Sequence, residues 1–192
     1  MRRRTSPTTI IVIIVASVVG ICCLGAAGIG FLGYRFITGA AKPLAECTMN
    51  FSLVQQAVDK YAEAHGGKLP SAATWQDDVR PYFQQIAGRR RDFGPFQVMD
   101  PNGDWGCTSG DTKTGMAFNS DLSGKERSQL ASQYDAILLF EIEAPKRNAA
   151  EPYKPRTFAA SPKFMGKPRG WFVVPLNGQP RAERGIGSGG SE

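Results

Sequence analysis

The longest apolar stretch of the chain lies near its N-terminus. Residues 10–32 read IIVIIVASVVGICCLGAAGIGFL, and no charged side chain occurs between Arg4 and Arg35. Because about 20 such residues span a bilayer as a helix, we predict a transmembrane signal anchor over residues 10–36. A cleaved signal peptide, cut after Ala40, is the alternative, although its hydrophobic region is usually shorter, about 7–15 residues.

Basic residues flank this stretch unequally, with Arg2, Arg3 and Arg4 before it and Arg35 and Lys42 after it. This bias predicts a cytoplasmic N-terminus and a single-pass cell-membrane protein whose C-terminal domain is extracytoplasmic. The lipid bilayer is then the first expected partner. Small residues four apart within the stretch also allow a homo- or hetero-oligomer through the membrane helix.

A helical period follows the apolar stretch. Apolar side chains recur on one face of residues 44–65 at steps of three and four, namely Cys47, Phe51, Val54, Val58 and Tyr61. This spacing predicts an amphipathic helix, which Gly66 and Gly67 end. A second helix begins after Thr74, and Pro81 limits it to about two turns.

Strand-like patterns occupy the second half of the chain. Residues 115–119, 136–142 and 170–176 are the expected strands, and residues 145–169 form a proline-containing loop. The glycine- and serine-rich tail is expected to be disordered. The predicted fold class is therefore α+β, with a transmembrane helix followed by a long amphipathic helix packed on a small antiparallel β-sheet.

These elements divide the chain into five parts. They are a basic N-terminus (1–9), the anchor (10–36), a linker (37–43), one extracytoplasmic domain (44–178) and the tail (179–192). The net charge of +6 arises mostly from the four arginines of residues 1–36, which contain no acid. The high pI thus reflects a membrane-flanking cluster, and we expect no nucleic-acid partner.

The domain contains two cysteines, Cys47 and Cys107. In an oxidising compartment, these two cysteines are the pair that could form an intramolecular disulfide within the domain. The alternative is two buried thiols.

Several segments, taken in order, resemble type II secretion pseudopilin-like proteins. Residues 47–70 (CTMNFSLVQQAVDKYAEAHGGKLP) are similar to the amphipathic helix and its exit in that family, and residues 74–82 to the helix that follows. Residues 115–119, 122–124 and 137–141 look like its later strands. The resemblance covers residues 47–143 and implies a type IV pilin-like domain. The prepilin cleavage motif is absent from this chain.

A calcium loop is a further possibility. Asp100, Asn102, Asp104 and Asp111 occupy positions 1, 3, 5 and 12 of an oxygen-ligand loop. Trp105 stands where such a loop needs glycine, so an ordinary turn is the default interpretation and no cofactor is expected.

Glu141 and Glu143 are two residues apart on an expected strand, which favours a solvent-facing edge. If Glu141 is partly buried, we expect it to accept hydrogen bonds from backbone or from an arginine. The sequence has no nucleophile elbow, phosphate loop or HExxH motif. We therefore expect no enzyme activity.

The preferred hypothesis is a pseudopilin-like protein with a structural or interaction role in secretion or surface assembly. The alternative is a binding module whose basic loop engages anionic lipid, polymer or a protein partner. Its candidate binding residues are Lys146, Arg147, Lys154, Arg156, Lys163, Lys167 and Arg169.

Overall fold

The first element of the computed structural model is helix α2, Lys42–Ala64. The structure describes residues 42–88, 96–109, 112–130, 132–133, 135–164 and 166–183. The apolar face expected from the sequence is buried, with Phe51, Val54 and Val58 fully covered, except that Tyr61 at its end is half-buried. The helix ends where Gly66 and Gly67 take positive φ angles of 64° and 84°, a conformation that favours glycine. The predicted amphipathic helix is thus confirmed.

Helix α3, Trp75–Gly88, is longer than the sequence predicts, because it continues through Pro81. Trp75, Val79 and Phe83 on one face of α3 are fully buried, and α3 packs against α2. Burial of these large side chains along the whole helix outweighs the one hydrogen bond that a proline removes.

Five strands follow one another across the sheet in the order β1-β2-β3-β7-β8, and a sixth, β4, pairs in parallel with β2. The neighbours along this path are antiparallel. Strands β5 and β6 form a separate two-stranded sheet. The strands are β1 Gly106–Ser109, β2 Thr112–Asn119, β3 Ile137–Ile142, β4 Ala150–Glu151, β5 Lys163–Phe164, β6 Lys167–Pro168, β7 Trp171–Pro175 and β8 Arg181–Glu183.

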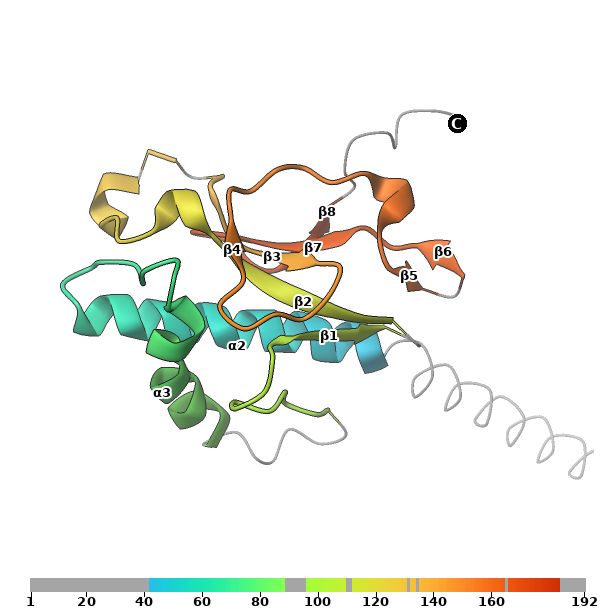
Figure 1. Cartoon of the computed structure of the whole chain (residues 1–192), viewed down its shortest axis with the longest axis horizontal. Coiled ribbons are helices and arrows are strands. Elements are labelled where there is room, and N and C mark those ends of the chain that lie inside the picture. The colour runs from blue at the N-terminus through green and yellow to red at the C-terminus, as the bar shows by residue number, and fades with distance from the viewer. Residues whose placement is uncertain are drawn as a thin grey trace, which may run out of the picture. The chain divides into compact units, whose positions relative to one another are not determined.

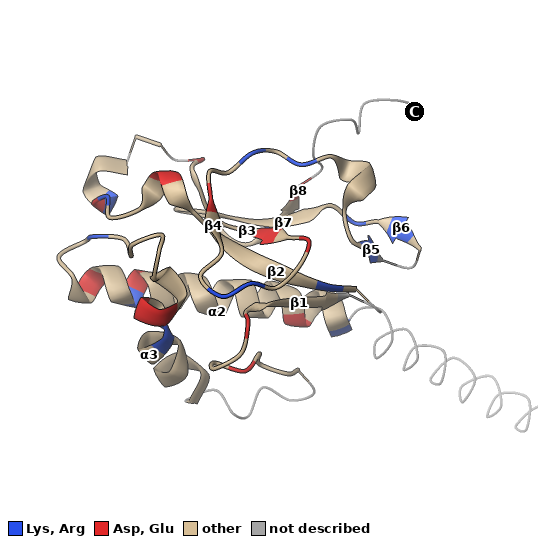
Figure 2. Cartoon of the chain, viewed as in Figure 1, with Lys and Arg blue, Asp and Glu red and all other residues tan. Residues whose placement is uncertain are grey.

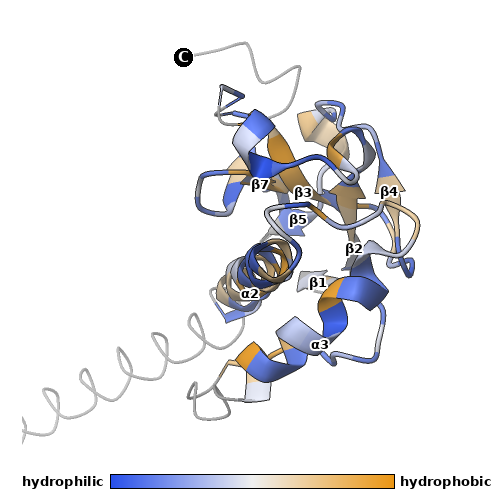
Figure 3. Ribbon diagram, turned by 90° about the vertical axis from the view of Figure 1, so that its left-hand side faces the viewer, coloured by the Kyte–Doolittle hydropathy of each residue, from blue (hydrophilic) through white to orange (hydrophobic). Residues whose placement is uncertain are grey.

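The two helices lie on the same side of the sheet (Figures 1 and 3). Alternating strand residues send side chains to both faces. Met116 and Phe118 of β2 belong to the main core with the helices, whereas Ala117 between them belongs to a second cluster with Phe140 and Val173. The sheet is therefore buried on both faces, by helices on one and by the connections between strands on the other.

The predicted fold class is corrected in its architecture. The sheet is six-stranded rather than small, and neither of the two helices that pack on it is a long N-terminal anchor. The expected strands at 136–142 and 170–176 are confirmed as β3 and β7. Arg181–Glu183 of the expected tail instead form β8 beside β7.

The predicted membrane anchor is also corrected. Among the residues that the structure describes, no helix has the length and apolar character that crossing a bilayer requires. The transmembrane helix, the signal anchor and the single-pass cell-membrane localisation are therefore not retained. The segment on which they rested, residues 10–36, lies outside the described residues.

A disulfide joins Cys47 of α2 to Cys107 of β1, with 5.2 Å between their Cα atoms. Of the two alternatives for these cysteines, the structure has the bonded pair. The bond fixes the first turns of α2 to the β1–β2 hairpin.

Replacing both cysteines with serine should lower the free energy of unfolding by about 2–4 kcal/mol, because the bond closes a 60-residue loop and restricts the unfolded chain. Urea denaturation of the two proteins measures this difference. Non-reducing mass spectrometry of the native protein should find the linked peptides. Free thiols at both positions would refute the bond.

Candidate functional site

The connection between β3 and β4 crosses β2 on the face away from the helices. Phe118 of β2 pairs with Leu139 of β3 on one edge and with Ala150 of β4 on the other, so residues 143–149 must pass over β2. They cross at Gly115, where an added Cβ would overlap the Ala144 carbonyl and the Pro145 Cα. Only glycine permits this close approach.

The far end of this connection is held by the N-terminus of α3. Asn148, in the left-handed conformation (φ 51°), accepts hydrogen bonds at Oδ1 from the backbone N–H groups of Gln76 (2.9 Å) and Asp77 (3.2 Å). The Gln76 side-chain oxygen in turn accepts from the Asn148 N–H at 2.9 Å. Asn148 thus caps a helix distant in sequence and satisfies two of its open donors.

Asp77 adds a charged contact beside this cap. Its carboxylate accepts hydrogen bonds from Arg147, with the closest at 2.6 Å, from Arg80 at 2.8 Å and from Asn148 at 2.7 Å. The bonds from Arg147 and Asn148 hold the pKa of Asp77 below its ordinary value. Arg147 therefore joins the connection to α3 instead of projecting freely toward a partner.

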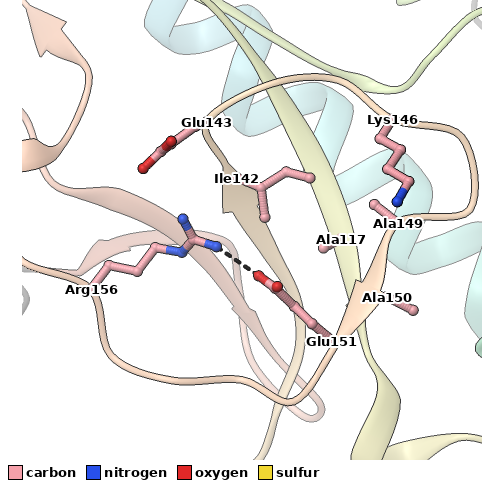
Figure 4. A pocket seen from close by; sticks show the side chains of 8 residues that line it. All are labelled: Ala117, Ile142, Glu143, Lys146, Ala149, Ala150, Glu151 and Arg156. Atoms are coloured by element: carbon pink, nitrogen blue, oxygen red, sulfur yellow. Dashed lines mark hydrogen bonds and ion pairs between the residues drawn. The ribbon is translucent and has the colours of Figure 1, made fainter.

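A groove of about 310 Å³ opens between this connection and β4 (Figure 4). Ala117 and Ala149 at its base are buried, and Ile142 is half-buried. Its charged lining comes from four side chains, two acidic and two basic. The lining residues are Ala117, Ile142, Glu143, Lys146, Ala149, Ala150, Glu151 and Arg156.

The four charged side chains of the groove are not equivalent. Arg156 donates to Glu151 at 2.7 Å, and its guanidinium lies 5.1 Å from the centre of the Trp171 ring. Glu143 and Lys146 are exposed, and neither has an ion-pair or hydrogen-bond partner for its side chain in the described part of the chain. One carboxylate and one ammonium thus remain available on the lining.

Tyr153 fixes the segment that follows β4. Its hydroxyl donates to the Glu183 carboxylate of β8, and its ring meets Phe140 edge-on with 5.3 Å between ring centres. Burial and the neighbouring Glu183 raise the pKa of this hydroxyl above its ordinary value. The segment is thereby held against the outer face of the sheet, next to the groove.

A buried ion pair lies inside the domain, and its residues do not line the groove. Glu141 of β3 is fully buried and forms an ion pair with Arg169, with contacts of 2.6 and 2.9 Å. It also accepts from the Thr114 hydroxyl at 2.5 Å and the Phe172 N–H at 3.0 Å. The expectation that a buried Glu141 accepts bonds from backbone and an arginine is confirmed, and the expectation of a solvent-facing edge is wrong for this residue.

The predicted basic loop is therefore divided. Arg147, Arg156 and Arg169 have carboxylate partners within the domain, whereas Lys146, Lys154 and Lys167 are exposed. Lys163 is exposed as well and has an interaction of its own. Figure 2 shows basic positions spread along the connections from β3 to β4 and from β4 to β7 rather than gathered into one patch.

The predicted calcium ligands lie in a turn. Asp100 Oδ1 accepts from the Asn102 N–H at 2.9 Å, which is the ordinary Asx turn that the sequence allowed. Asn102 Oδ1 accepts from Gln84 at 3.3 Å, and Asp104 is exposed. Asp111 lies outside the described residues.

Sequence reasoning missed the groove itself. Its base consists of alanines, and Glu151 belongs to a two-residue strand, so neither carries a recognisable pattern. The available signal was Gly115 two residues before Ala117, because a glycine inside a strand pattern marks a close backbone approach. No family model matches the chain, and no curated protein or solved structure matches it either.

Proposed function

We propose that this domain is a non-catalytic, pseudopilin-like interaction module that associates with a second copy of itself through the outer face of α2. The observation that carries the proposal is a stripe without charge on that face. Ala45, Met49, Ser52 and Gln56 recur at steps of four, three and four, opposite the fully buried face, and all are half-buried, Met49 by partial packing against the main core. Lys60 and Glu63 continue the face toward the end of the helix.

The composition of this stripe suits a contact between helices. Interface centres are depleted of charged residues, and the side chains here are short or flexible. Gln56 already bonds to Ser52 within the helix (3.2 Å to the carbonyl oxygen), which limits the polar groups that association would leave unpaired. Figure 2 shows the middle of α2 free of acidic and basic positions, with charge near its ends.

The rest of the domain supports a scaffold rather than an enzyme. Its buried ion pair, Glu141 with Arg169, joins β3 to the segment just before β7, and the disulfide joins α2 to β1. Both contacts fix elements to one another. A rigid helix-on-sheet body presents the face of α2 in one orientation, which favours specific association.

Ser52→Glu should abolish self-association of the full chain, because a second copy would have to bury an unpaired carboxylate. Sedimentation equilibrium of the full chain at low and high salt measures this. Association of the unaltered protein should persist at high salt, since the stripe has no charge to screen.

The matched control is Ala64→Glu, which adds the same charge to an exposed position of α2 outside the stripe. It should leave self-association unchanged. A chain that stays monomeric at all concentrations, or one whose association disappears at high salt, would contradict the proposal. The second result would favour binding through the exposed lysines between β4 and β7 instead.

A further inference from the structure

The groove beside the β3–β4 connection has a charge arrangement that suits a particular kind of ligand. Its lining contains two carboxylates, an ammonium and a guanidinium, so its formal charge is zero. Glu151 and Arg156 neutralise each other at 2.7 Å. Glu143 and Lys146 do not form such a pair, and they lie on opposite sides of Ile142 in Figure 4.

The wall that carries these two side chains is rigid before any ligand arrives. The connection is seated on Gly115 at its start. At its end, the Ala149 carbonyl accepts hydrogen bonds from Trp75 Nε1 (2.8 Å) and from the Phe118 N–H (2.9 Å). Asn148 caps α3 beside it. Since a preformed site loses little freedom on binding, modest contacts suffice for measurable affinity.

We propose that this groove binds a small zwitterion of the amino-acid or peptide-terminus type, with its ammonium at Glu143 and its carboxylate at Lys146. Such a ligand finds a partner for each of its charges. A simple anion or cation would meet one attractive and one repulsive side chain, and an apolar ligand would desolvate both charges without compensation. The volume of about 310 Å³ is at the low end for small-molecule sites.

This inference is independent of the proposed self-association. The groove lies on the sheet face that contains Ala117, whereas α2 covers the opposite face. Loss of zwitterion binding therefore leaves self-association intact, and the failure of either proposal is distinguishable from failure of the other.

Titration of the full chain with the dipeptide alanyl-alanine, followed by calorimetry or NMR, tests the proposal. We expect saturable binding that weakens about 10-fold, equivalent to about 1.4 kcal/mol, in Glu143→Gln and in Lys146→Met. N-acetyl-alanyl-alanine lacks the ammonium, so Glu143→Gln should not weaken its binding further. Alanyl-alanine amide lacks the carboxylate, and Lys146→Met should leave its binding unchanged.

Lys154→Met is the matched control, because Lys154 is exposed on the neighbouring segment but does not line this groove. Its dipeptide affinity should equal that of the unaltered chain. Free alanine distinguishes the two possible sources of the zwitterion. If it binds as tightly as alanyl-alanine, the ligand is a single amino acid, and if it binds more weakly, the ligand is a peptide terminus. Absence of saturable binding for both probes, or affinities that neither groove variant alters, would overturn the proposal.

Discussion

Replacing Glu141 with leucine should lower the free energy of unfolding by about 3–5 kcal/mol. The carboxylate is fully buried, and it balances Arg169, whose side chain is 4% exposed. Its removal leaves a buried guanidinium without a counter-charge and the Phe172 N–H without an acceptor. Chemical denaturation of the variant and the unaltered protein measures the difference.

A double-mutant cycle identifies the cause of this loss. Glu141→Leu together with Arg169→Met removes both charges, and it should destabilise the domain much less than Glu141→Leu alone, because no unpaired charge remains. Glu143→Leu is the control for the substitution itself, since Glu143 is exposed two residues further on. It should change stability by no more than about 0.5 kcal/mol. Equal losses in the single and double variants would show that the ion pair is not the reason.

Periodicity predicted the parts of this fold in which burial follows a regular repeat. The apolar steps from Cys47 to Val58 located α2, and the apolar run at 136–142 located β3. In both, a continuous pattern is imposed by one buried surface. Short strands such as β4, with two residues, offer no repeat to detect, and tertiary pairing alone defines them.

The errors have equally specific causes. Pro81 was expected to end α3, but packing against α2 continues past it. The prediction of a solvent-facing edge for Glu141 is wrong because the residue that allows its burial, Arg169, is 28 residues away in sequence. The same holds for the groove: Glu143 and Lys146 belong to one short connection, but only the fold places Arg156 on the same lining. Long-range partners cannot be read from local composition.

Phe51→Ala should lower the free energy of unfolding by about 3–5 kcal/mol, because Phe51 is fully buried between α2 and the sheet. Its ring stacks on that of Phe172 in β7, with 5.8 Å between ring centres. Truncation removes this contact and leaves a cavity where the helix meets the strand. Thermal or urea denaturation measures the loss.

Phe96→Ala is the matched control for this substitution, since Phe96 is 37% exposed. It should change stability by no more than about 0.5 kcal/mol. The contrast tests whether the apolar stripe of α2 stabilises the domain by packing on the sheet, because the same atoms are removed in both variants. A loss below about 1 kcal/mol for Phe51→Ala would mean that α2 contributes little through this face. The rigid presentation of its outer stripe, on which self-association depends, would then lack a physical basis.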